Sequence, residues 1–280
     1  SVYKKSEKEI LLDPAFSVIE NTPEWRLFWK KEWYNEAESA LSEIEYNISR
    51  GRREEASRIS AELSGMYPGN KTAVFAGAYV SYGLGRYQES VAALRELISG
   101  ERNNTAYLSL LARAEEASGN PAGASVTYSR LMELEYLDPS VYIKRAGCYR
   151  QTREYEKAAR DLEKYVSWYP ESRDAIRLAG KIESERGNNL KAIELFSRNV
   201  KLNPGDPECF IDRAGSYFIS RSWDYAARDY SMALDIKPEN PDVWLNKGIS
   251  LLNMGKTEDA CHDFRRALSQ GNRKAASYIS

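Results

Sequence analysis

The stretch Ala192-Ile193-Glu194-Leu195-Phe196 recurs with changed letters at a fixed interval of 34 residues along the chain. Each copy places a small residue four positions before a large one, and residues with that spacing lie on the same face of a helix. The clearest copies are Ala124 with Tyr128, Ala158 with Leu162, Ala192 with Phe196, Ala226 with Tyr230, and Ala260 with Phe264. Toward the N-terminus the register continues through Ser90 with Leu94 to Ala56 with Ser60, where the large residue is lost. A fixed period of this length predicts a repeat array.

Seven units follow from this register, and each is long enough for two antiparallel helices and two turns. The units are 37–70, 71–104, 105–138, 139–172, 173–206, 207–240 and 241–274. The turn inside a unit falls on glycine in five of the seven, because glycine adopts the left-handed conformation that ends a helix at low cost. Arg153 and Arg221 stand at that position in the other two. Proline at Pro68, Pro170, Pro204 and Pro238 stops the second helix of a unit.

Two terminal segments lie outside the register and are predicted to cap the array. In residues 1–36, Thr22-Pro23-Glu24 favours a helix start, with threonine as N-cap and proline at the first helical position. The aromatic residues that follow are spaced three and four apart on one helix face, at Trp25, Phe28, Trp29 and Trp33. We interpret this stripe as a structural cap rather than a ligand site. In residues 275–280, Tyr278 and Ile279 are predicted to pack back on the last repeat.

The amino-acid composition limits the classes of partner that the protein is expected to bind. Hydrophobic residues make up 42% of the chain and charged residues 29%, with a formal net charge of -1, which is typical of a soluble folded protein. Nucleic acid and acidic membrane surfaces are not favoured, because both normally require a basic excess. No run approaches the roughly 18 apolar residues of a membrane span.

Signatures of catalysis or cofactor binding are absent from the sequence. Cys148, Cys209 and Cys261 match no metal-ligand spacing and are predicted to be free thiols. The single histidine, His262, has no serine or cysteine that the sequence places beside it, and no glycine-rich phosphate loop follows a strand. We therefore expect no enzymatic activity, no organic cofactor and no metal.

The repeat pattern resembles that of tetratricopeptide repeat (TPR) proteins. First helices carry a bulky residue near their start and a small residue four positions later. These pairs are Leu108 with Ala112, Tyr142 with Ala146, Ile176 with Gly180, Phe210 with Ala214, and Trp244 with Gly248. The first unit departs from the pattern, with Ile44 in place of the small residue. The resemblance implies an all-α, right-handed α-solenoid of seven 34-residue helix-turn-helix repeats with N- and C-terminal capping segments.

The stretch from Gly255 to Ala275 also resembles the closing repeat of secreted TPR proteins of Gram-negative bacteria. This resemblance implies a periplasmic or envelope-associated bacterial protein, with an export signal upstream of Ser1. A cytoplasmic protein is the alternative, because no apolar signal region opens the chain.

By the same resemblance, the protein is expected to be a non-enzymatic scaffold that binds an extended or helical segment of a partner in the groove lined by first helices. The co-chaperone subgroup grips a terminal carboxylate with lysines and asparagines. Those points here carry Ile143, Gly147, Leu178, Glu208 and Asp212, so the carboxylate clamp is missing. The alternative is a structural subunit of a larger cell-envelope assembly, which contacts partners through its ends or its convex face.

The register also predicts which side chains line the groove. They are Phe75, Tyr79, Tyr82, Arg113, Glu116, Arg150, Arg177, Lys181, Ile211 and Phe218. Aromatic flanks would enclose a mainly basic centre, so an acidic segment is the expected protein partner. For each aromatic residue the alternative is packing against a neighbouring helix, and the sequence leaves that choice open.

Overall fold

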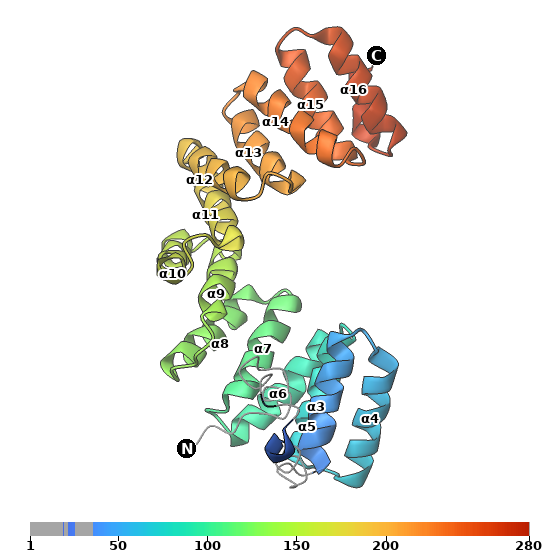
Figure 1. Cartoon of the computed structure of the whole chain (residues 1–280), viewed down its shortest axis with the longest axis vertical. Helices are drawn as coiled ribbons and strands as arrows, with labels where there is room; N and C mark the ends of the chain where they lie inside the picture. Colours follow the sequence, from blue (N-terminus) through green and yellow to red (C-terminus); the bar gives the residue numbers. More distant parts are fainter. Residues whose placement is uncertain (1–18, 20–21, 26–35, 280) are drawn as a thin grey trace. The chain divides into compact units, whose positions relative to one another are not determined.

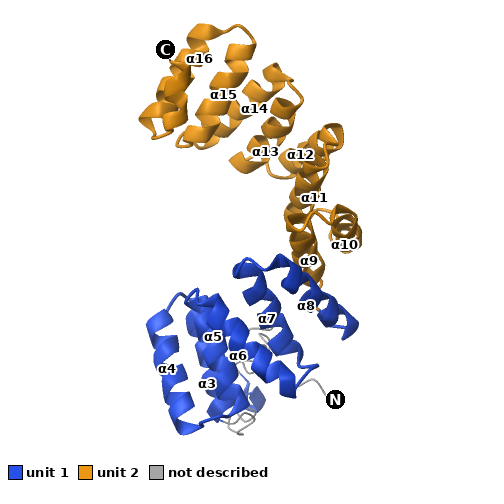
Figure 2. Cartoon of the chain, turned by 180° about the vertical axis from the view of Figure 1, so that it is seen from behind, with its two compact units in different colours: residues 1–137 blue, residues 138–280 orange. Residues whose placement is uncertain are grey.

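The computed structural model describes residues 19, 22–25 and 36–279, and the described part of the chain is helical throughout, with no strand (Figure 1). The chain divides into two compact units, residues 1–137 (unit 1) and residues 138–280 (unit 2) (Figure 2). Within each unit successive helices pack on one another as antiparallel neighbours. The predicted all-α solenoid class is confirmed.

The helices alternate between the first and the second helix of each predicted repeat. Unit 1 contains α3 (Glu36–Ser49), α4 (Arg53–Met66), α5 (Lys71–Gly83), α6 (Tyr87–Gly100), α7 (Thr105–Ala117) and α8 (Pro121–Glu133). Unit 2 contains α9 (Ser140–Gln151), α10 (Tyr155–Trp168), α11 (Arg173–Glu185), α12 (Asn189–Leu202), α13 (Pro207–Ile219), α14 (Trp223–Ile236), α15 (Pro241–Asn253), α16 (Thr257–Ser269) and the 3-10 helix η2 (Arg273–Tyr278). Odd-numbered helices are the first helices and even-numbered helices the second helices.

Local sequence explains where these helices begin and end. The side chain of Asn70 accepts hydrogen bonds from the backbone N–H groups of Thr72 and Ala73 at the start of α5, which satisfies donors that the helix itself leaves unpaired. Arg153 and Arg221 adopt φ angles of 62° and 57° at the turns that end α9 and α13. The register thus located the left-handed turns even where glycine is missing.

The recurring small–large pair forms the buried contact between the two helices of a repeat. The five alanines and the five large residues that define the register are all exposed by no more than 3%. Opposite them, Gly180 on α11 approaches the Phe196 ring so closely that a Cβ atom there would lie 2.5 Å from it. The close approach of the helices leaves no room for a side chain at this position.

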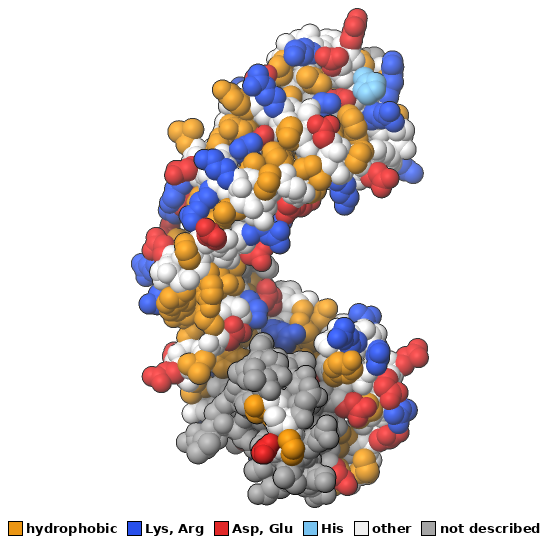
Figure 3. Space-filling view, in the orientation of Figure 1, with side chains coloured by type: hydrophobic (Ala, Val, Ile, Leu, Met, Phe, Trp, Pro, Cys, Tyr) orange, Lys and Arg blue, Asp and Glu red, His pale blue; other side chains and the backbone are white. Residues whose placement is uncertain are grey.

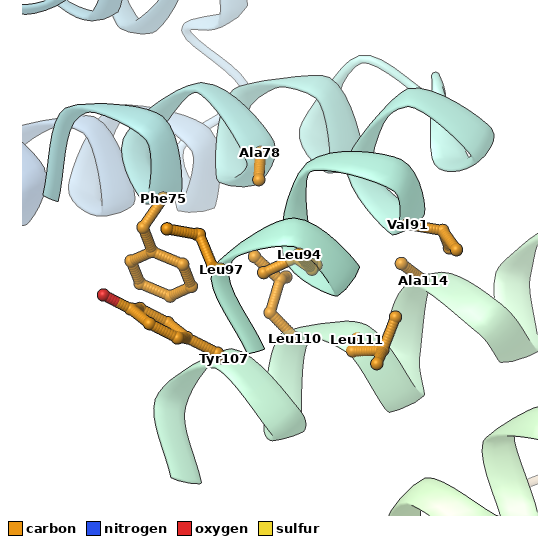
Figure 4. Close-up of a cluster of buried hydrophobic side chains, with 9 residues drawn as sticks. All are labelled: Phe75, Ala78, Val91, Leu94, Leu97, Tyr107, Leu110, Leu111 and Ala114. Carbon is orange, nitrogen blue, oxygen red and sulfur yellow. The ribbon is translucent and has the colours of Figure 1, made fainter. Parts of the chain in front are cut away.

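In unit 1 a continuous hydrophobic cluster joins α5, α6 and α7 (Figure 4). Leu94 and Leu97 of α6 lie between Phe75 of α5 and Leu110 of α7. The ring centroids of Phe75 and Tyr107 are 4.9 Å apart. The cluster therefore holds two successive repeats together.

Buried ion pairs add a second contact inside three repeats of unit 2. Arg145 donates to both oxygens of Asp161, at 2.8 and 2.6 Å, and Arg213 donates to both oxygens of Asp229, at 2.7 Å each. Lys247 lies 3.2 Å from Asp263 at the equivalent positions. All three carboxylates are buried. In the repeat 173–206 these positions hold Ala179 and Leu195 instead, so an apolar pair replaces the ion pair.

At the chain ends, the described residues agree with the predicted helix start at Thr22 and with the predicted packing of Tyr278 and Ile279. The hydroxyl of Thr22 accepts a hydrogen bond from the backbone N–H of Trp25 at 3.2 Å, and residues 23–25 are helical. Phe28, Trp29 and Trp33 of the predicted stripe lie outside the described residues. At the other end, the Tyr278 ring stacks on Phe264 at 4.8 Å, and Ile279 packs on the last repeat, as predicted.

Replacing Gly180 by alanine is expected to destabilise the protein, because the enclosed Phe196 ring has no space into which it can move. We expect a cost of about 1–3 kcal/mol in the free energy of unfolding, measured by urea denaturation. Gly147→Ala is the matched control, because nothing lies within 4 Å of a Cβ at this helical glycine. It is expected to stabilise α9 by about 0.5–1 kcal/mol. Equal stability of the two variants would contradict the close helix approach.

Replacing Arg213 by alanine leaves the buried Asp229 carboxylate without its partner, so we expect a loss of about 3 kcal/mol in unfolding free energy. The double variant Arg213→Ala, Asp229→Leu reproduces the Ala179 and Leu195 pair, and it is expected to recover most of that loss. The measurement is a double-mutant cycle by denaturant unfolding. A double variant no more stable than Arg213→Ala would show that the apolar pair cannot substitute for the ion pair here.

Candidate protein-binding surfaces

Unit 1 presents a cation on an aromatic platform formed by its first helices. The guanidinium carbon of Arg113, on α7, lies 4.7 Å from the centroid of the Tyr82 ring of α5. Burial acts to lower the pKa of Arg113, but the neighbouring phenols of Tyr82 and Tyr79 outweigh it and hold that pKa above its ordinary value. Within the part of the chain that the structure describes, no carboxylate lies at ion-pair distance from Arg113. We call Tyr79, Tyr82 and Arg113 the arginine–tyrosine site.

Hydrophobic packing inside unit 1 holds the two tyrosines of this site in place. Both pack partly against the hydrophobic cluster of α5, α6 and α7 and remain half-buried. Burial, followed by the charge of Glu45, raises the pKa of the Tyr79 phenol. The phenol therefore stays neutral at physiological pH and can serve the cation as an acceptor or as an aromatic surface.

The acidic residues of α7 are engaged inside unit 1. The Glu116 carboxylate accepts a hydrogen bond from the Tyr128 hydroxyl at 3.0 Å. Its neighbour Glu115 is buried, accepts from Thr127 at 2.7 Å and lies 2.8 Å from Arg95. Glu116 was predicted to line the groove, and the structure shows that it also ties α7 to α8.

Phe75 does not line a surface, which corrects the prediction. Its side chain is 6% exposed, and its ring faces Tyr107 of the next repeat in the cluster of Figure 4. The register placed Phe75 at an inward position of the first helix of its repeat, where it was expected to line the groove. The Tyr107 ring covers that position, because successive first helices pack against each other there.

In unit 2 the predicted basic residues are neutralised by carboxylates of the following first helix. Arg150 of α9 lies 2.5 Å from Glu185 of α11. Arg177 of α11 pairs with Glu208 of α13 at 2.7 Å and donates from Nε to Asp212. Lys181 lies 3.7 Å from Asp212. We call these four pairs the ion-pair ladder.

The ladder corrects the expectation of a mainly basic centre. Three cations face three carboxylates, and on the side seen in Figure 3 basic and acidic side chains of unit 2 are interspersed. Burial acts to lower the pKa of Arg177. The hydrogen bonds and charges of Asp212 and Glu208 outweigh burial and hold that pKa above its ordinary value, so the residue stays charged. The sequence carries a signal for the ladder. Arg150 with Glu185 and Arg177 with Asp212 are each separated by 35 residues, one repeat plus one position.

Ile211 and Phe218 of α13 are half-buried and pack against the core of α13 and α14. The Phe218 ring meets Trp223 edge to face at 5.1 Å and lies 6.5 Å from Tyr230. Both side chains remain partly exposed, on the same helix that carries Glu208 and Asp212.

The described residues offer no group of three or more histidine, cysteine or acidic side chains arranged to hold a metal ion. Cys148, Cys209 and Cys261 form no disulfide bond. Among the described helices, none combines the length and apolar character needed to span a lipid bilayer.

Comparison with known families agrees with the helix pairs. The tetratricopeptide repeat family matches residues 139–172 and 241–270, which are the fourth repeat and most of the last. These two segments are tetratricopeptide repeats. Both matched segments lie in unit 2, where buried ion pairs link the helices of the repeat.

Proteins of known structure share this fold over most of the chain, and curated proteins are similar to parts of it. A solved tetratricopeptide repeat protein from Parabacteroides merdae has a TM-score of 0.66 and 20% identity, covering 87% of this chain and 97% of its own. YrrB, solved as a TPR protein with an unusual peptide-binding site, has a TM-score of 0.53 and 18% identity, with 66% and 96% covered. The heat-shock cognate co-chaperone sgt12 of Aspergillus fumigatus is 24% identical over 164 residues, 58% of this chain and 45% of that protein. The chain spans less than half the length of the curated relatives it matches.

Proposed function

We propose that this TPR protein is a non-enzymatic scaffold that binds an extended or helical segment of a partner protein along the surface of its first helices. The TPR fold supports a protein-interaction role. The likeness to YrrB, a TPR protein with a peptide-binding site, adds support of the same kind. The proposal concerns which surface binds and what chemistry the partner carries.

The observation that carries the proposal is the arginine–tyrosine site of unit 1. Arg113 keeps its charge on a half-buried aromatic platform without a described carboxylate partner. An acidic side chain of a partner would supply the missing counter-charge, and Tyr79 and Tyr82 would supply flat apolar contact. Arginine and tyrosine are also the residue types that most often dominate the binding energy of protein interfaces. A partner segment with acidic residues is therefore preferred.

A second candidate function is a structural subunit of a larger cell-envelope assembly, which contacts its partners through the second helices or the chain ends. The observation in its favour is an aromatic cluster in unit 2. Trp168 and Tyr169, at the end of α10, are both nearly half exposed, and Tyr142 meets Trp168 at 5.3 Å. Exposed aromatic clusters of this kind mark contact surfaces in many proteins.

Replacing Arg113 by glutamine is expected to weaken partner binding by roughly tenfold or more, as loss of a dominant interface arginine does. The measurement is affinity capture from cell extract followed by titration of the captured partner. Arg58→Gln is the matched control, because it removes the same charge from a second helix of unit 1, where Arg58 pairs with Glu55 and Glu62. Binding to wild type and to the control is expected to weaken with added salt.

Photo-crosslinking separates the two candidate functions. A benzoylphenylalanine placed at Tyr82 is expected to crosslink the partner, and the same probe at Trp168 is expected not to. Crosslinking at Trp168 alone, together with unchanged capture by Arg113→Gln, would contradict the first candidate and favour the assembly subunit.

A further inference from the structure

The ion-pair ladder of unit 2 contains two kinds of carboxylate. Asp212 is the inner one, with a side chain 13% exposed, and it contacts both Arg177 and Lys181. Glu208 and Glu185 are the outer ones, with side chains 50% and 39% exposed. Each outer carboxylate touches only one cation of the ladder. The inner carboxylate is therefore held from two sides, while the outer ones are held from one.

The outer pairs contribute little to stability. An exposed ion pair gains only a small Coulomb energy in water, and holding two long side chains in one geometry costs entropy. The buried pairs inside the repeats are different, because Arg145 and Arg213 each grip both oxygens of a buried aspartate. The electrostatic contribution to stability within these repeats therefore comes from the buried ion pairs. The outer ladder pairs can separate at a low cost in free energy.

The ladder also leaves one donor unused. Glu185 receives a bond from Nη1 of Arg150, but the Nε atom of Arg150 is out of contact with solvent and has no hydrogen-bond partner. A guanidinium group binds a carboxylate best through two parallel N–H bonds. The Arg150 pair therefore has a single hydrogen bond, and it is weaker than the two-bonded pairs of Arg145 and Arg213.

We propose that Glu185 and Glu208 are internal substitutes for the carboxylates of a bound acidic segment, which takes their places on Arg150 and Arg177 while Asp212 stays bound. This proposal rests on the proposed function and names the partner chemistry of the unit 2 surface. The exchange is non-covalent: the two glutamates turn to solvent, each arginine gains one carboxylate of the segment in return, and Arg177 also keeps Asp212. Ile211 and Phe218, which are partly exposed on the helix that carries Glu208, offer apolar contact to the same segment.

Such an exchange makes the surface selective. A tethered carboxylate competes at an effective concentration in the millimolar range, so a single acidic side chain in solution does not displace it. A segment that brings two acidic residues together with an apolar residue binds through several contacts at once. The ladder therefore rejects isolated acidic groups and admits acidic segments with matching apolar side chains.

The test removes the competing carboxylates and keeps the cations. The double variant Glu185→Gln, Glu208→Gln is compared with Glu156→Gln, Asp224→Asn, which removes the same charge from second helices, where these acids pair with Arg186 and Arg228. The probe is a fluorescein-labelled peptide of repeated Glu-Leu-Glu-Ser, with Gln in place of Glu as the neutral peptide. Dissociation constants are measured by fluorescence anisotropy at low salt, and helicity is checked by circular dichroism.

We expect the ladder variant to bind the acidic peptide roughly 2- to 5-fold more tightly per released cation than the charge-matched control, in line with the strength of exposed ion pairs. Adding Arg150→Gln to the ladder variant is expected to remove part of that gain. Equal affinity of the ladder variant and the control overturns the exchange, because the gain would then reflect overall charge alone.

The outcomes also distinguish this inference from the proposed function. If wild type binds the acidic peptide, Arg113→Gln weakens it and the ladder variant matches the control, the function stands and the exchange is wrong. If neither wild type nor the ladder variant prefers the acidic over the neutral peptide, both are wrong.

Discussion

The close contact between a small residue on the first helix and a large residue on the second is the constraint on which every repeat after the first depends. At Gly180 the approach is so tight that one added carbon would overlap the Phe196 ring. Because these repeats bury this contact, their outward-facing positions are not needed for packing between the two helices and can carry charged or aromatic side chains. The differences between repeats accordingly lie in polar side chains, and those differences define the candidate binding surfaces.

The two units use charge in different ways on their first helices. In unit 1, Arg113 rests on tyrosine rings, which leaves its positive charge available to a partner. In unit 2, the cations are already matched by Glu185, Glu208 and Asp212, so any anionic partner meets competition from within the chain. Similar residue types on the same repeat framework thus give a cation without a described carboxylate partner in unit 1 and cations paired with carboxylates in unit 2.

Much of the fold could be predicted from sequence, because the 34-residue period is a local signal repeated many times. It located the helix pairs and even the left-handed turns at Arg153 and Arg221. The site was harder to predict. The register predicted that Phe75 lines the groove, but the ring of Tyr107 from the next repeat covers it, and the register alone does not show such coverage. The pairing of Arg177 with Asp212 likewise depends on the spacing between successive first helices and on long side-chain conformations, which a list of residues on one face does not contain.

The replacement of a buried ion pair by Ala179 and Leu195 in one repeat bears on how such arrays diverge. An exchange between the two solutions needs two substitutions, and their order matters. If the arginine is replaced first, a buried aspartate is left without its ion-pair partner. If the aspartate is replaced first, the remaining arginine can reach water, as Arg213 could with a side chain that is 19% exposed. Mutational paths between the charged and apolar forms are therefore expected to pass through loss of the acid. The repeats of one chain can drift apart in this way without any of them losing the fold.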